Sequence, residues 1–393
     1  MDPRRNPFAP GAGTPPPELA GRDRLREEIS IALHRIANGR SAQSRILYGL
    51  RGVGKTVLLN EIRLAAEAEG IAVVMIEAPE NRSLPAVLAP ALRAALMRMN
   101  RLRAAGEGIQ RALRALAGFI KLKASYGDIE LAMELDAEPG LADSGDLESD
   151  LTDLVRSVGE AAQSTGTAAA IFIDELQYIA EDQLAALITA LHRASQRRLP
   201  ITLVGAGLPQ LLGQMGNAKS YAERLFVFEP VGPLDKGAAW AAVRDPIRAE
   251  GEDIEDSALE AIFEATQGYP YFLQEWGKQS WDIAEASPIR VAHVALASPA
   301  ALAQLDASFF RVRFDRMTPA EKRYMRAMAE LGEGPHRSGD IADQLNVKVT
   351  SVAPLRSALI AKGMIYSPNH GDTAFTVPMF DAFMRRIMPR FPT

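Results

Sequence analysis

Short apolar runs alternate with helix-like segments through the first 230 residues of the chain. The strand-like runs are stretches of β-branched and other apolar residues at positions 45–48, 71–76, 169–173 and 201–204. Unbroken apolar runs of this length are typical of strands that are buried on both faces of a sheet. Segments 56–69 and 181–198 are predicted helices, because the second places Leu184, Leu187, Ile188 and Leu191 at helical spacing. This alternation predicts an α/β fold, with a parallel sheet between two layers of helices.

A long insert separates the second and third predicted strands. Residues 84–114 are rich in alanine and arginine and predict one or two helices. Residues 119–125 and 129–135 alternate with a period of two around Tyr-Gly-Asp, which is typical of a β-hairpin. An acidic loop is expected over 136–150. Whether this insert, residues 84–150, contacts a partner or only decorates the surface is left open by the sequence.

The pattern changes twice after position 231. Residues 235–251, 257–267 and 270–285 predict a small helical bundle, and Thr318 with Glu321 forms the signature of a capping box at the start of a further helix. A short helix at 341–345, a turn at 346–349, a helix at 350–362 and a hairpin of 364–367 with 373–377 then predict a winged helix-turn-helix. The expected parts are an extended arm (1–20), an α/β core (21–230), a helical lid (231–308) and a winged-helix domain (309–393).

Composition narrows the class of protein. The 393 residues are 47% apolar, which is ample for ordinary cores, and they include no cysteine, so disulfides and thiolate metal sites are excluded. The net charge is −5, but Lys and Arg outnumber Asp and Glu by 12 to 8 from Arg313 onward, against 32 to 41 before it. The N-terminus lacks the apolar core of a signal peptide, and no apolar run approaches the roughly 20 residues that span a bilayer. We therefore expect a cytoplasmic protein with no membrane partner.

A glycine-rich segment after the first predicted strand carries the clearest chemistry. Its residues match G-x-x-x-x-G-K-[ST] in full and are Gly49, Leu50, Arg51, Gly52, Val53, Gly54, Lys55 and Thr56, followed by Val57. Glycines let successive backbone N–H groups converge on phosphate oxygens, and the helix that follows adds its positive N-terminal end. Lys55 is expected to reach the β- and γ-phosphates of ATP, with the Thr56 hydroxyl as a ligand of Mg²⁺.

The third predicted strand ends in two adjacent carboxylates, Asp174 and Glu175. Paired with the glycine-rich loop, they have the pattern of a Walker B motif, in which Asp174 lies beside Mg²⁺ and Glu175 polarises the attacking water. Because nucleotide binding alone does not require Glu175, the pair favours hydrolysis of ATP to ADP and phosphate.

These motifs resemble those of AAA+ P-loop ATPases, in the group that joins replication-initiator, archaeal-type and STAND ATPases, over about residues 15–390. The resemblance implies a three-layer P-loop core, a helical lid and a C-terminal winged helix. It also implies that Arg22 lies near the adenine, that Arg224 acts as an arginine finger and that Gln177 senses the γ-phosphate or contacts a neighbour. A contact of Arg224 with a second copy would make a nucleotide-dependent homo-oligomer, whereas monomers occur in the STAND branch.

Two departures from the AAA+ pattern indicate slow turnover. The fourth predicted strand ends in Gly205-Ala206-Gly207, where many AAA+ proteins have a polar sensor residue. Gly268-Tyr269-Pro270 stands where others have a lid arginine, and Pro270 resembles the STAND proline that packs against the nucleotide. A slow switch between ATP-bound and ADP-bound states fits these losses better than a processive motor does.

The ligand of the winged helix is left open between DNA and protein. If DNA binds, helix 350–362 would enter the major groove with Thr350, Ser351, Arg356 and Ser357, while Asn369 and His370 would contact it from the wing. Arg356 and Lys362 are the only cations of that helix, so the alternative is a STAND-type signalling or scaffold ATPase whose winged helix and hairpin bind protein partners. A metabolic kinase is disfavoured because no small-substrate lid can be found.

Overall fold

The computed structural model describes residues 1–11, 19–78, 80, 82–102, 106–123 and 137–391. The chain folds into two compact units. Unit 1 contains Met1–Arg22, Gly49–Gly54 and Val231–Thr393, and unit 2 contains Asp23–Tyr48 and Lys55–Pro230.

A five-stranded parallel sheet forms the centre of unit 2, in the order β2-β3-β4-β1-β5. Its strands are β1 (Ser44–Tyr48), β2 (Ala72–Glu77), β3 (Ala169–Asp174), β4 (Ile201–Gly207) and β5 (Phe226–Pro230). The four predicted strands are confirmed, and every residue of β3 and β4 is buried, as their apolar runs indicate. The fifth strand, β5, escaped the sequence analysis because it lies at an edge, where burial is incomplete, and ends in a proline.

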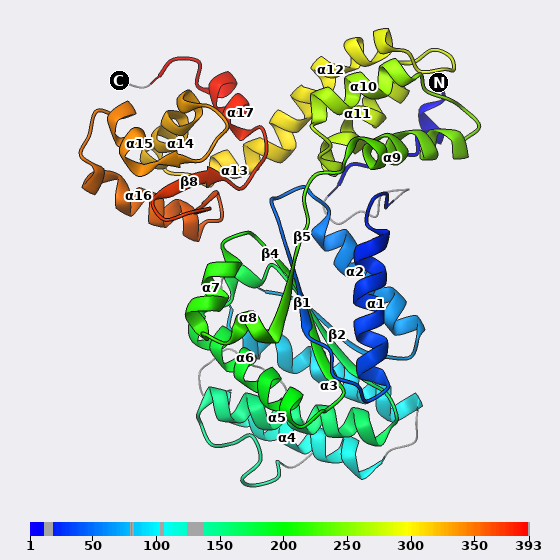
Figure 1. Ribbon diagram of the computed structural model, residues 1–393, viewed down its shortest axis with the longest axis vertical. Helices are drawn as coiled ribbons and strands as arrows, with labels where there is room; N and C mark the ends of the chain where they lie inside the picture. The colour runs from blue at the N-terminus through cyan, green and yellow to red at the C-terminus, as the bar shows by residue number, and fades with distance from the viewer. Residues whose placement is uncertain (12–18, 79, 81, 103–105, 124–136, 392–393) are drawn as a thin grey trace. The chain divides into compact units, whose positions relative to one another are not determined.

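Helices cover both faces of this sheet (Figure 1), which confirms the predicted α/β fold. Helices α1 (Asp23–Ala37) and α2 (Lys55–Ala68) lie together on one face, and α5 (Leu147–Ser164) and α6 (Glu181–Gln196) pack side by side on the other. A right-handed crossover after each strand requires this division, because the chain moves in opposite directions across the sheet before and after β2. The short elements η3 (Leu176–Tyr178), α7 (Leu211–Ala218) and α8 (Ala222–Leu225) follow β3 and β4.

The insert between β2 and β3 is helical where the structure describes it. It forms α3 (Leu84–Leu102) and α4 (Glu107–Lys123), so the predicted β-hairpin is wrong over 119–123, while 124–136 lies outside the described residues. The local alternation around Phe119 misled the prediction. A longer stripe of buried residues at helical spacing, made by Ala112, Leu113, Leu116 and Ile120, determines the structure instead.

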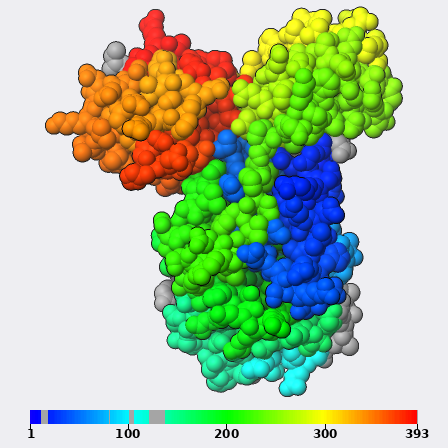
Figure 2. Space-filling view, in the orientation of Figure 1, coloured from blue at the N-terminus to red at the C-terminus, as the bar shows by residue number. Residues whose placement is uncertain are grey.

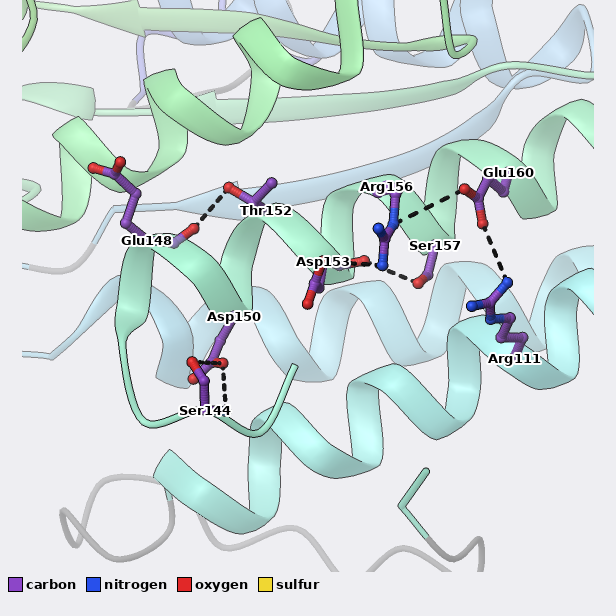
Figure 3. Close-up of polar contacts among 9 residues, drawn as sticks. All are labelled: Arg111, Ser144, Glu148, Asp150, Thr152, Asp153, Arg156, Ser157 and Glu160. Carbon is purple, nitrogen blue, oxygen red and sulfur yellow. Dashed lines mark hydrogen bonds and ion pairs between the residues drawn. The ribbon is translucent and has the colours of Figure 1, made fainter. Parts of the chain in front are cut away.

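Buried and surface charges anchor α5 (Figure 3). The Asp150 carboxylate is 1% exposed and accepts hydrogen bonds from the Ser144 backbone nitrogen and hydroxyl, at 2.8 and 2.7 Å, and from the Gly145 nitrogen at 3.2 Å. Further along the helix, Arg156 pairs with Asp153 at 3.0 Å. The polar loop before α5 is thereby tied to the first turn of the helix, which lies on the central sheet.

A four-helix bundle occupies the middle of unit 1. It consists of α9 (Lys236–Ala249), α10 (Asp256–Thr266), α11 (Pro270–Ile283) and α12 (Val291–Leu305), of which α12 was not predicted. The first residues of the chain form a 3₁₀ turn, η1 (Pro3–Arg5), and pack on α11. The Phe8 ring lies against Gly277, and the Trp281 indole nitrogen donates to the Asp2 carbonyl at 2.9 Å.

The last part of unit 1 is a winged helix. After η4 (Asp306–Phe310) and α13 (Arg311–Asp315), it contains α14 (Pro319–Leu331), α15 (Ser338–Gln344), α16 (Val349–Ala361) and α17 (Phe380–Ile387). A three-stranded antiparallel sheet of β6 (His336–Arg337), β8 (Asp372–Phe375) and β7 (Ile365–Tyr366) completes it. Figure 2 shows these segments, in orange and red, as one continuous body. The predicted capping box is confirmed, since Thr318 and Glu321 each bond the other's backbone nitrogen.

Candidate active site

The carboxyl end of β3 brings one residue of each motif together inside unit 2. Asp174, 4% exposed, is the last residue of β3, and Thr56 is the second residue of α2. The Thr56 hydroxyl donates a hydrogen bond of 2.6 Å to Asp174 Oδ2. Residues 118 positions apart are therefore held in direct contact at the edge where parallel α/β sheets bind their ligands.

Opposing influences act on the Asp174 carboxyl. Burial raises its pKa above the ordinary value of 3.8, and the neighbouring Glu175 charge acts in the same direction. The hydrogen bond from Thr56 and the positive charge of Lys55, itself 8% exposed, lower the pKa. A carboxylate and a hydroxyl oxygen in contact form the hard, oxygen-only donor set that Mg²⁺ prefers, so these two residues fit such an ion.

Glu175 begins a sharp turn after β3. Its φ of 52° and ψ of 38° lie in the left-handed region, which costs a non-glycine residue about 1 kcal/mol or more. The Glu175 nitrogen donates to Asp174 Oδ1 at 2.8 Å, and the Gln177 side-chain amide donates to Glu175 Oε2. The turn therefore gives the two adjacent carboxylates different partners: Asp174 meets Thr56, and Glu175 meets Gln177.

The loop Gly49–Gly54 belongs to unit 1 and needs its glycines for two separate reasons. Gly52 and Gly54 have φ values of 81° and 87°, where side chains are strained. A side chain at Gly49 would overlap the carbonyl oxygen of Val231. Leu50 and Arg51 between them are half-buried, as is Val57 in α2.

Backbone and arginine contacts within unit 1 hold this loop. The Arg22 guanidinium donates to the carbonyl oxygens of Val53, at 3.2 Å, and Gly232, and burial lowers its pKa. The Tyr271 nitrogen, next to Pro270 at the start of α11, donates to the Gly52 carbonyl at 3.2 Å. Arg22, expected near the adenine, thus bonds the backbone of the phosphate loop, and Pro270, expected against the nucleotide, is next to Tyr271, which bonds that backbone. The contact of either residue with a nucleotide stays a prediction.

The Arg51 backbone nitrogen donates to the Thr376 carbonyl of the winged helix at 3.0 Å, a contact that no local sequence pattern predicts. Arg224 is exposed on α8 within unit 2, and its role as an arginine finger also stays a prediction.

The helix expected to meet DNA offers a surface of small residues. Thr350, Ser351 and Ser357 on α16 are exposed. Arg356, in contrast, donates to Thr373 Oγ1 at 2.9 Å, to Ser367 Oγ at 2.8 Å and to the Asp372 carbonyl at 2.9 Å. The predicted contact residue therefore ties α16 to the hairpin of the wing.

The fold and this edge of the sheet define a P-loop nucleotide-binding core. Comparison with protein families identifies it further: residues 18–204 match the AAA ATPase domain, and residues 307–384 match a domain of unknown function, DUF8462. The chain thus has a core that matches the AAA ATPase domain, followed by a helical region and a winged helix.

Similar proteins span nearly the whole chain. A curated relative, an uncharacterized HTH-type transcriptional regulator of Methanocaldococcus jannaschii, is 23% identical over 369 residues, which cover 91% of this chain and 86% of the relative. Among solved structures, the Walker-type ATPase of Pyrococcus abyssi matches with a TM-score of 0.57 and 16% identity, over 93% of this chain and 96% of its own. The Orc1 protein of Aeropyrum pernix matches with a TM-score of 0.45 and 16% identity, over 94% of each chain.

Proposed function

We propose that this protein binds ATP and hydrolyses it slowly, as a nucleotide-dependent switch. The observation that carries the proposal is the hydrogen bond between Thr56 and Asp174, because it joins the residue that follows the phosphate loop to the acidic end of β3. The AAA ATPase domain matched over residues 18–204 supports the same function.

Each residue of this edge has a distinct part in the proposed reaction. Lys55 balances charge on the β- and γ-phosphates, and the backbone N–H groups of Gly49–Thr56 bind phosphate oxygens. Thr56 and Asp174 would hold Mg²⁺, which supplies positive charge against the triphosphate when bound. Glu175 accepts a proton from the attacking water. At the same time the water oxygen bonds to the γ-phosphorus, and the bond between that phosphorus and the oxygen that leaves with ADP breaks.

Substitution of Glu175 tests hydrolysis directly. Glu175→Gln keeps the shape of the side chain but removes the proton acceptor, so turnover should fall roughly 10²- to 10⁴-fold with ATP still bound. Phosphate release, and the affinity for a fluorescent ATP analogue, measure the two properties separately. Glu181→Gln, on the exposed start of α6, is the matched control and should hydrolyse ATP like the wild type.

Lys55→Ala provides the complementary test of nucleotide binding. It should lose affinity for ATP itself, because the loop then lacks its phosphate charge. Full turnover in both Lys55→Ala and Glu175→Gln would contradict the proposal.

We further propose that the winged helix associates with DNA. Two facts support this: the C-terminal part from Arg313 is basic, and a relative over most of the chain is named an HTH-type transcriptional regulator. Lys348, the exposed residue at the start of α16, would then meet backbone phosphate, together with the hydroxyls of Thr350 and Ser351.

The dependence of DNA affinity on salt tests this association. Binding of a labelled duplex, measured by anisotropy from about 50 to 300 mM salt, should weaken with a log–log slope of about −0.9 for each phosphate contacted. Lys348→Ala should make that slope shallower by about one contact, and Lys236→Ala on the helical bundle should not change it. A slope near zero would exclude contacts with DNA phosphates.

A protein partner for the winged helix is the second candidate, and the hydrogen bonds that hold the Arg356 side chain on the wing favour it. Three hydrogen bonds hold the Arg356 side chain on the wing. The exposed face of α16 therefore consists mainly of Ala353, Pro354 and hydroxyl residues, and Val349 at its start is 50% exposed. Such a surface suits a protein better than a polyanion. Recovery of the same partner by the wild type and by Val349→Asp would count against it.

A homo-oligomer is the remaining part of the proposal. Arg224 is exposed on α8, so a neighbouring copy could receive its guanidinium beside bound ATP. Mass measurement with and without a non-hydrolysable ATP analogue tests this assembly, and Arg224→Ala should remain monomeric in both conditions.

A further inference from the structure

The missing polar sensor at the end of β4 has a structural explanation in the turn after β3. A side chain at Gly205 would overlap Leu176 of η3, and a Cβ at Gly207 would lie 2.8 Å from Gln177 Oε1 and 2.8 Å from Leu211 Cδ2. The glycines of β4 therefore leave room for Leu176 and Gln177. In effect, a side chain from the turn after β3 occupies the place that a polar residue of β4 would take.

The Gln177 carboxamide is held on both sides. It is 6% exposed, and its Oε1 accepts a hydrogen bond of 3.0 Å from the backbone nitrogen of Leu208, just beyond β4. Its Nε2 donates to Glu175 Oε2. The orientation of the amide is determined, because the Leu208 N–H can only donate and an ionised Glu175 can only accept.

We propose that Gln177 positions the Glu175 carboxylate for catalysis, in place of the side chain that Gly207 lacks. The inference rests on the proposed ATPase function. Through Gln177, the end of β4 is connected to the carboxylate that accepts the proton of water. A shift of Leu208 would move the amide and so re-orient the Glu175 side chain. The Asp174 carboxylate accepts hydrogen bonds from the Thr56 hydroxyl and from the backbone nitrogen of Glu175, and neither bond involves Gln177 or Leu208.

An apolar replacement of the same length separates positioning from packing. Gln177→Met removes both hydrogen bonds, so kcat should fall roughly 10- to 100-fold while the affinity for an ATP analogue changes less than about 2-fold. Hydrogen exchange at the Leu208 amide should quicken even without nucleotide. Gln183→Met is the matched control, because Gln183 Oε1 also accepts a backbone N–H, from Leu84 at 2.7 Å, but away from Glu175.

A transfer of the polar group to β4 gives a second, stricter test. Gly207→Asn alone should destabilise the fold, since its Cβ would crowd Gln177. Gln177→Ala should lose turnover, and the double variant Gln177→Ala with Gly207→Asn should recover several-fold of it, because the amide then comes from β4 itself.

The outcomes distinguish this inference from the proposed function. An inactive wild type would remove both. An active wild type with Gln177→Met equal to Gln183→Met in kcat, or with its loss confined to KM, would overturn the role of Gln177 alone. A folded double variant no more active than Gln177→Ala would also overturn it.

Discussion

At the scale of single residues, the site holds a carboxyl group whose burial opposes its charge. Asp174 is 4% exposed, and burial is the largest influence on its raised pKa. The folded protein therefore binds a proton at this group more tightly than the unfolded chain does. Stability is lost as the pH rises from the ordinary value of 3.8 through the raised folded value, and the loss is complete above it.

Asp174→Asn should reverse this loss. The amide oxygen can still accept from Thr56, but no charge is buried, so the nucleotide-free variant should gain stability over the wild type at pH 7 and less or none at pH 4. The urea midpoints of the variant and the wild type, measured at both pH values, give this difference in stability. The contributions of other titrating groups largely cancel, because both proteins contain them. A gain that is larger at pH 4 would contradict the burial argument. ATP hydrolysis should be lost in the same variant, which separates stability from function.

At the scale of elements, α5 depends on the polar loop before it more than on its own cap. The exposed Asp146 caps the helix by accepting a hydrogen bond of 2.8 Å from the Ser149 nitrogen. The buried Asp150 accepts hydrogen bonds from the Ser144 nitrogen and hydroxyl (Figure 3) and from the Gly145 nitrogen. Hydrogen bonds to a buried charged acceptor contribute more than the single bond of an exposed cap, although the donors Ser144 and Gly145 are themselves exposed.

Asp150→Ala should therefore destabilise the protein by about 2–3 kcal/mol, against about 1 kcal/mol for Asp146→Ala. Denaturant unfolding followed by circular dichroism measures both. Equal losses would mean that the bonds to Ser144 and Gly145 contribute nothing beyond a cap.

The sequence predicts an element well where residues close together in the sequence determine its structure. The buried strands β1 to β4, the helix after the glycine-rich loop and the winged helix carry local periodic patterns, and these predictions are confirmed. Over 119–123 the same kind of reasoning was wrong, because five alternating residues cannot outweigh a helical stripe that begins at Ala112.

The candidate site could be predicted only in part, for a related reason. Lys55, Thr56, Asp174 and Glu175 belong to contiguous motifs, which a sequence displays directly. The contacts of Gln177 depend on the Leu208 nitrogen, 31 residues away, and on the absence of a Cβ at Gly207. The sequence shows that Gly207 has no side chain, but not that Gln177 fills the space. In the same way, nothing local indicates that Arg356 bonds the wing.

At the scale of the whole molecule, the start of the chain is part of the core of unit 1. Phe8 is 3% exposed and lies against Gly277, where a Cβ would come within 2.8 Å of its ring, and Asn6 donates to Asp282 Oδ1 at 2.8 Å. The helical bundle is therefore completed by residues from the opposite end of the sequence. None of the helices in the described part of the chain has the length and apolar character that a membrane span needs.

Phe8→Ala should destabilise unit 1 by up to about 3 kcal/mol, since it leaves a cavity over α11. The fluorescence of Trp276 and Trp281, both in α11, reports the unfolding of this bundle. Arg4→Ala, at a side chain that is 90% exposed, is the control and should leave the unfolding midpoint unchanged. An equal effect of the two variants would show that Phe8 adds nothing to the bundle.

The contact between Phe8 and Gly277 has a consequence for folding during synthesis. Gly277 is translated about 270 residues after Phe8, so the apolar ring has no partner in the chain during that interval. The parallel sheet of unit 2 ends at Pro230 and can fold in that interval. Nascent chains of this protein should accordingly expose the segment around Phe8 until α11 has been translated, and a chaperone that binds apolar segments would bind it in that interval.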